Sequence, residues 1–180
     1  DKKKFGRHKL SMTDAAFSSS MNQQILLCKK MADQLNYPIS HIKPHGALYH
    51  QLSINTELAK QFVELCAAID KTLIIVGFTG SQLIKQAKAF GTDCWAEGFA
   101  DRRYLADGSL APRNLPQAVI QDPLVVRAQV EQIVTDGTVT AIDGSTVKLQ
   151  VDTLCLHSDT ANAAIIAKSL ADWRIKNKVM

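Results

Sequence analysis

Two kinds of apolar pattern alternate along this chain. Continuous apolar runs of strand length are typical of strands buried on both faces, and segments with apolar residues at helical spacing separate them. The clearest run is Thr72–Phe78, and the clearest helix is Ser81–Phe90, which Gly91 is placed to end. The pattern predicts strands at 39–43, 72–78, 94–99 and 153–156, helices at 11–36, 55–69, 81–90, 122–136 and 160–176, and hairpin turns at 107–108 and 143–144.

This alternation predicts an α/β fold with a parallel sheet, either open or rolled into a barrel. The run that ends at Ile42 is expected to be a buried strand, because Pro44 stops it. Four parallel strands are few for a closed barrel, and the first predicted helix has no strand before it. We therefore expect a single domain over residues 1–180 that is incomplete or open at its N-terminal side.

Composition and charge narrow the class of protein. The 180 residues are 46% hydrophobic and 21% charged, which are ordinary values for a globular protein. The net charge of +4 comes from the chain ends, because residues 10–173 contain 13 basic and 16 acidic residues. We therefore expect no nucleic-acid partner. No apolar stretch approaches the ~18–20 residues that span a membrane. The four cysteines lack metal-type spacing and no secretory signal is visible, which favours a cytoplasmic protein.

Reactive side chains follow the predicted strands. In parallel α/β sheets, ligands bind at the carboxyl ends of the strands, so we expect these side chains to converge on one site. The candidates are Lys43, His45, Glu97, Asp101, Arg102, Arg103, His157 and Asp159.

Two arginines and a carboxylate are candidates for anion binding. Arg102 and Arg103 beside Asp101 suit a carboxylate or phosphate ligand, although solvated surface charge is the alternative. Glu97 lies inside an apolar strand, and a buried carboxylate needs a partner, for which Arg102, Lys43 or a metal is the candidate.

A metal site is a further hypothesis. His45, His157, Asp159 and Glu97 offer oxygen and nitrogen ligands, but no two of them form a diagnostic spacing. Asp159 and Thr160 also suit the N-cap of the last helix, and a capping role leaves a role in the site open.

Three segments resemble signatures of the LamB/YcsF family. They are 41–49 (HIKPHGALY), 96–118 (AEGFADRRYLADGSLAPRNLPQA) and 155–170 (CLHSDTANAAIIAKSL). Phe5-Gly6-Arg7 is similar to the FGR element of the family. Two departures stand out: the family's first βα units are not in this sequence, and Ser158 and Ala161 replace the usual glycine and proline.

The resemblance implies a parallel-stranded deviant (β/α) barrel of the glycoside hydrolase/deacetylase type, here without its first βα units. It also implies ATP-driven hydrolysis of 5-oxo-L-proline to L-glutamate, together with the other subunits of a 5-oxoprolinase complex. ATP is then the expected cofactor, and a divalent metal is a further candidate.

The same resemblance suggests a division of roles among the candidates. Arg102 and Arg103 would hold the substrate carboxylate or a phosphate, and Lys43 would neutralise phosphoryl charge. A water molecule would be activated by His45, His157 or Asp159.

Two alternatives stay open. One is a metal-dependent deacetylase or amidohydrolase acting on a carbohydrate-like substrate, with His45, His157 and an acidic residue as ligands. The other is a non-catalytic scaffold subunit whose barrel mouth is a partner interface.

Overall fold

The computed structural model describes residues 4–178 and consists of two compact units. The first unit ends at Ala96 and the second begins at Glu97. The strand β3, Cys94–Phe99, begins in the first unit and ends in the second. None of the helices in the described part of the chain is long and apolar enough to cross a membrane.

The first unit combines four helices with short parallel strands. Its elements before β3 are α1 (Asp14–Gln34), β1 (His41–Ile42), α2 (Ala47–Ile54), α3 (Thr56–Ile69), β2 (Ile74–Phe78) and α4 (Gln82–Phe90). Side chains that favour helix starts begin three of the helices. Thr13, Asn55 and Ser81 each accept a hydrogen bond from a backbone N–H of the first turn. Gly91, in the left-handed conformation, ends α4 as predicted.

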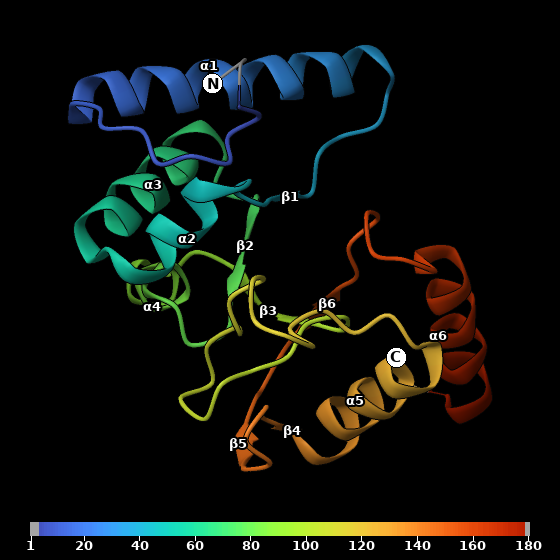
Figure 1. Ribbon diagram of the computed structural model, residues 1–180. Coiled ribbons are helices and arrows are strands. Elements are labelled where there is room, and N and C mark those ends of the chain that lie inside the picture. Colours follow the sequence, from blue (N-terminus) through green and yellow to red (C-terminus); the bar gives the residue numbers. More distant parts are fainter. Residues whose placement is uncertain (1–3, 179–180) are drawn as a thin grey trace. The chain divides into compact units, whose positions relative to one another are not determined.

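The core of the first unit lies where α1, α3 and α4 meet β2. Its buried side chains include Phe17 of α1, Phe62 and Val63 of α3, Ile75 of β2 and Leu83 of α4. Figure 1 shows α1 next to α3, and the two helices are in contact.

The strand β1 is much shorter than predicted. It pairs in parallel with β2, with His41 opposite Ile74, and β2 is its only neighbour among the described strands. The prediction of a buried strand at 39–43 is wrong, because this edge strand is covered on one side only: His41 is exposed and Ile42 is half-buried. The helix α2 is a second difference, since the sequence pattern predicted no helix between the strand at 39–43 and residue 55.

The second unit pairs β3 with β6 and adds two helices and a hairpin. Its elements after β3 are α5 (Pro123–Asp136), β4 (Thr138–Thr140), β5 (Thr146–Lys148), β6 (Thr153–Cys155) and α6 (Ala163–Asn177). Asp122 caps α5 and Pro123 takes its first position, as the sequence suggested. The hairpin β4–β5 pairs Val139 with Val147 around the predicted turn at 143–144.

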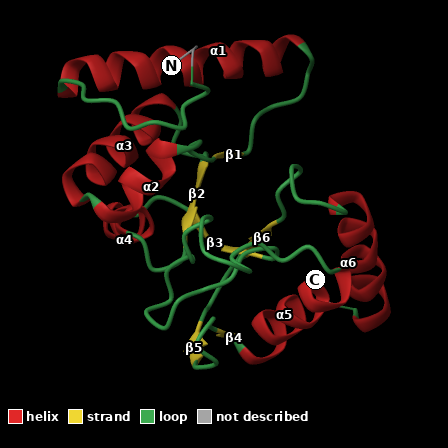
Figure 2. Cartoon of the chain, viewed as in Figure 1, coloured by secondary structure: helices red, strands yellow, loops and turns green. Residues whose placement is uncertain are grey.

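The core of the second unit lies between α5, α6 and the end of β3. Val126 and Val130 of α5 and Ile166 and Trp173 of α6 are buried together with Ala100. Figure 2 shows the long loop that connects β3 to α5. This loop contains the turn predicted at 107–108, where the backbone N–H of Leu105 donates to the carbonyl oxygen of Ser109. The predicted α/β class with parallel strand pairing is confirmed.

Candidate active site

The strands β3 and β6 bring two predicted site residues together. Phe99 pairs with Cys155 in parallel register, so Asp101 and His157 leave the sheet two residues later, side by side. Oδ1 of Asp101 accepts a hydrogen bond from Nδ1 of His157 at 2.9 Å, and Oδ2 accepts one from the backbone N–H of His157 at 3.2 Å. The hydroxyl of Thr160 also donates to Oδ2.

The contact with Asp101 fixes the tautomer of His157. A carboxylate can only accept, so Nδ1 carries the hydrogen and Nε2 presents a lone pair. The imidazole stacks on Phe99, with ring centroids 5.4 Å apart and planes at 15°, and its side chain is 23% exposed. A partly exposed imidazole oriented by a buried carboxylate is typical of a general base.

Asp101 is held in its ionised form despite its burial. The residue is fully buried, and burial acts to raise the pKa of a carboxyl group. Hydrogen bonds from His157 and Thr160 act in the opposite direction and prevail, so the pKa of Asp101 lies below its ordinary value of 3.8. The carboxylate therefore supplies a full negative charge next to the imidazole.

Buried polar side chains hold the loop that contains Asp101. The amide nitrogen of Gln129 donates to the carbonyl oxygens of Phe99, Ala100 and Arg102, at 2.9–3.2 Å. The hydroxyl of Tyr104 accepts from the N–H of Phe99 at 2.6 Å. Burial is the main cause that raises the pKa of Tyr104, so its phenol stays protonated. These contacts fix the backbone on both sides of Asp101.

Arg102 is part of the same support. Its guanidinium is buried and donates to the carbonyl oxygens of Ala118 and Ala111. Burial, followed by the nearby charge of Arg113, lowers the pKa of Arg102 from 12.5. Arg102 therefore binds backbone carbonyl groups, a role that the sequence did not predict. Arg103 is half-buried, and anion binding by its side chain stays a prediction.

Glu97 and Asp159 lie in different surroundings within the second unit. Glu97 is buried in β3, opposite Thr153 of β6. Asp159 is exposed and lies 3.9 Å from Arg113, whose side chain is also exposed. The expected N-cap role of Asp159 and Thr160 is wrong: Asn162 is the N-cap of α6, because the intervening turn uses the Thr160 hydroxyl on Asp101.

Lys43 and His45 belong to the first unit. Nε2 of His45 lies 3.1 Å from the carbonyl oxygen of Phe5, and the two rings form a T-shaped contact at 4.9 Å. The ammonium group of Lys43 lies 5.9 Å from the ring centroid of Tyr49. Gly46 allows the segment around Gly6 to pack closely against it, because a Cβ atom at position 46 would lie 2.5 Å from the carbonyl oxygen of Gly6.

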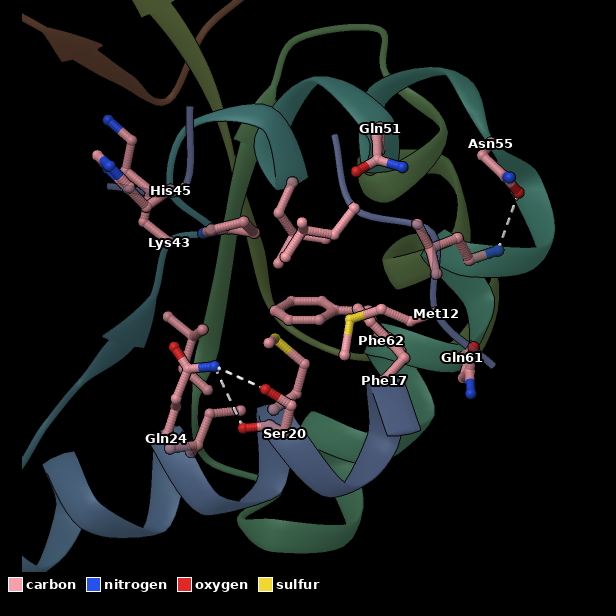
Figure 3. A pocket seen from close by; sticks show the side chains of 18 of the residues that line it. Met12, Phe17, Ser20, Gln24, Lys43, His45, Gln51, Asn55, Gln61 and Phe62 are labelled. Carbon is pink, nitrogen blue, oxygen red and sulfur yellow. Dashed lines mark hydrogen bonds between the residues drawn. The ribbon is translucent and has the colours of Figure 1, made fainter. Parts of the chain in front are cut away.

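A groove of about 1140 Å³ lies beside these residues in the first unit. Figure 3 shows the rings of Phe17 and Phe62 inside it and Lys43 and His45 toward one end. Its lining comes from the segment before α1, from α1 and α3, and from β1 with its flanking residues. Ile42 of β1 and the two phenylalanines contribute apolar surface to it.

Metal ligands do not gather in the part of the chain that the structure describes. No group of three or more His, Cys, Asp or Glu side chains there has a geometry that would hold a metal ion. The predicted metal site of His45, His157, Asp159 and Glu97 therefore has no support from this geometry.

The sequence missed two supporting residues. Gln129 stands on the apolar face of α5 between Val126 and Ile133, and this polar residue in an apolar stripe is the signal that was available. Thr160 was considered as a helix cap with a role in the site left open, and nothing in the sequence indicated that its hydroxyl meets Asp101.

The fold defines an α/β protein, and the histidine–carboxylate pair is its candidate active site. The family model described as the LamB/YcsF family matches residues 1–179. The chain therefore belongs to the LamB/YcsF family, as the sequence resemblance predicted.

Relatives and a solved structure agree with this assignment. The chain is 41% identical over 166 residues to the 5-oxoprolinase A-subunit of Limosilactobacillus fermentum, with 92% of this chain and 66% of the relative covered. It is 36% identical over 170 residues to the protein of the same name from Neisseria meningitidis serogroup A, with 94% and 69% covered. The crystal structure of the lactam utilization protein from Thermus thermophilus matches with a TM-score of 0.88 at 29% identity, covering 96% of this chain and 69% of that one.

The chain spans about two thirds of the length of these relatives. The high TM-score over 96% of the chain shows that it has the fold of this family.

Proposed function

We propose that the chain acts in lactam metabolism as part of a 5-oxoprolinase, which opens 5-oxo-L-proline to L-glutamate with cleavage of ATP. The names of the relatives support a role in 5-oxoproline or lactam metabolism. The single structural observation that supports a chemical role is the contact between Nδ1 of His157 and the buried carboxylate of Asp101.

The chemistry explains why such a pair is needed. A lactam amide is a poor electrophile, and transfer of a phosphoryl group from ATP to its carbonyl oxygen activates the carbonyl carbon. A water molecule then adds to this carbon and gives up a proton to a base. The C–N bond of the ring breaks as its nitrogen takes up a proton, which leaves an acyl phosphate, and a second water molecule displaces phosphate to give glutamate. In our proposal Nε2 of His157 accepts the proton of the first water molecule, and Asp101 stabilises the imidazolium that forms.

The anion-binding role belongs to Arg103 in this proposal. Its neighbour Arg102 uses its guanidinium on two backbone carbonyls, whereas Arg103 is half-buried. A guanidinium suits the carboxylate of 5-oxoproline or a phosphate. The ATP site and the binding surfaces for the partner subunits stay predictions without assigned residues.

The test is a reconstituted reaction. The full-length protein and the other subunits of a 5-oxoprolinase complex are incubated with 5-oxoproline and ATP, and glutamate and ADP are both measured. We expect the two products in equal amounts, and Asp101→Asn to lower kcat by about 100-fold or more. His50→Ala, which changes an exposed histidine of α2, is the matched control and keeps normal kcat.

The outcomes separate the proposal from its alternatives. Turnover without ATP that depends on an added divalent metal favours the deacetylase or amidohydrolase hypothesis. A folded Asp101→Asn protein that still supports full turnover, in a complex that needs the chain, favours the scaffold hypothesis.

A further inference from the structure

The turn after β6 directs three donors to one carboxylate. A backbone hydrogen bond from the N–H of Thr160 to the carbonyl oxygen of His157, at 3.3 Å, closes the turn. From this turn the N–H of His157, its Nδ1 and the hydroxyl of Thr160 all reach Asp101. A buried carboxylate with three donors is fixed in rotation as well as in position.

The two oxygens of Asp101 differ in their partners. Oδ1 is the nearer acceptor for the imidazole, at 2.9 Å, while Oδ2 lies 3.2 Å from the same Nδ1 and also receives the backbone N–H and the Thr160 hydroxyl. Rotation of the carboxylate would break the contact with Thr160 and would also carry Oδ1 away from His157. Thr160 is only 7% exposed, so water does not readily replace its hydroxyl.

We propose that Thr160 is a positioning residue, whose hydroxyl holds the Asp101 carboxylate in the rotation that keeps His157 in its Nδ1–H tautomer. The proposal rests on the proposed function, in which Nε2 of His157 accepts the proton. Thr160 need not touch the substrate, because its effect reaches the reaction through Asp101 and His157.

The surrounding charges are the same with or without the hydroxyl. The negative charge of Asp101 interacts electrostatically with Arg102 and Tyr104. At the exposed side of the turn, Asp159 pairs with Arg113. A substitution at position 160 that preserves size therefore changes one hydrogen bond and no charge.

The test compares Thr160→Val, which keeps the shape and removes the hydroxyl, with Thr160→Ser, which keeps the hydroxyl. Full-length protein labelled with 15N-histidine is examined by NMR, and His157→Asn identifies the His157 signals. In wild-type protein and in Thr160→Ser we expect the Nδ1–H tautomer with a slowly exchanging Nδ1 proton. In Thr160→Val this proton should exchange about 10-fold faster and part of the population should shift to the Nε2–H tautomer.

His45 is the internal control in the same spectra, because its Nε2 contacts the Phe5 carbonyl oxygen and not Asp101. Its signals should not change. In the reconstituted reaction, Thr160→Val should lower kcat about 10-fold with little change in KM, and Thr160→Ser should restore it.

The proposal is overturned if folded Thr160→Val keeps the wild-type tautomer and Nδ1 proton exchange. Thr160→Ala is the substitute if Thr160→Val does not fold, with the same expectation. Absence of 5-oxoproline-dependent turnover in the wild-type complex refutes the proposed function instead, and leaves the NMR result to decide the role of Thr160.

Discussion

His157 and His45 both follow a strand of a parallel sheet, but different kinds of partner hold their side chains. The imidazole of His157 bonds to a buried carboxylate, whereas that of His45 bonds to the carbonyl oxygen of Phe5 and is exposed. A carboxylate orients the ring and stabilises its protonated form, while a neutral carbonyl mainly orients it. The comparison teaches that position at a strand end does not by itself distinguish a base from an anchor.

The largest expected effect is on turnover. His157→Ala should lower kcat by ~100- to 10,000-fold, which is the usual contribution of a general base, with little change in KM. The sequence analysis left His45, His157 and Asp159 as alternative candidates for this base. From the neutral partner of His45 we now expect a smaller loss there, of about 10-fold or less.

Steady-state kinetics of the reconstituted complex measure both variants, and circular dichroism confirms that each is folded. Equal losses of kcat would mean that the charged partner of His157 gives it no advantage. A larger loss for His45→Ala would reverse the comparison.

The next largest effect concerns the glycines that support each histidine. Gly46→Ala should lower the free energy of unfolding by roughly 2–4 kcal/mol, since φ is 62° there and the new Cβ would meet the Gly6 carbonyl oxygen. Gly98→Ala should cost about 1–3 kcal/mol, because its Cβ would lie 2.8 Å from a methyl group of Val151, which has room to adjust only in part.

Urea unfolding gives both values, and kinetics show where each change acts. Gly98 lies in β3 beneath the Asp101–His157 pair, so Gly98→Ala should lower kcat more than Gly46→Ala does. If Gly46→Ala proves neutral for stability, the close contact between residues 6 and 46 is not a feature of the folded protein.

A third prediction distinguishes the two arginines. Arg102→Lys should destabilise the protein by about 1–3 kcal/mol, because an ammonium group does not reproduce the fork that reaches Ala111 and Ala118. Arg103→Lys should leave stability nearly unchanged and raise KM for 5-oxoproline. Thermal unfolding and steady-state kinetics measured on the same samples test this division, and a stable Arg102→Lys protein with a raised KM would contradict it.

The smallest expected effect is on acid stability. The pKa of Asp101 is lower in the folded protein than its ordinary value of 3.8, so the folded state binds this proton less readily than the unfolded chain does. The stabilisation is complete above pH 3.8 and is lost as the pH falls toward the folded-state pKa. Asp101→Asn should therefore flatten the loss of stability in this range.

Urea midpoints measured from about pH 5 to about pH 3 give the slope of stability against pH. Asp107 and Asp143 also have lowered pKa values, caused mainly by hydrogen bonds from Ser109 and Ser145, and they remain in the variant. The expected result is thus a reduced slope. An unchanged slope would show that the bonds from His157 and Thr160 do not hold the carboxylate ionised.

Much of the fold could be predicted because its signals are local. The helix from Ser81 to Gly91 has its cap, its apolar face and its terminating glycine within a few residues of one another. The strand at 94–99 and the helix at Pro123 were predicted at their observed positions for the same reason. The strand near Ile42 was predicted too long, because its burial depends on neighbouring strands and not on its own sequence.

The candidate site was harder to predict, because its contacts join distant segments. The sequence indicated Asp101 and His157 as candidates but gave no sign that they form a pair, which follows from the register of β3 on β6. The sequence suggested anion binding for Arg102 and did not indicate its contacts with the backbone. Nothing in a local pattern shows that a guanidinium will meet the carbonyls of Ala111 and Ala118.

The support of the Asp101 loop has a consequence for how this region tolerates change. Arg102 and Gln129 bond to carbonyl oxygens, and Tyr104 to a backbone N–H and C=O, so these hydrogen bonds do not depend on which side chains the loop carries. Ala111 and Ala118 are buried and must stay small, whereas the side chains between them are exposed. The length of the loop is not free, because one added residue would move a carbonyl away from its donor. Along this loop, substitutions should therefore be tolerated where insertions and deletions are not.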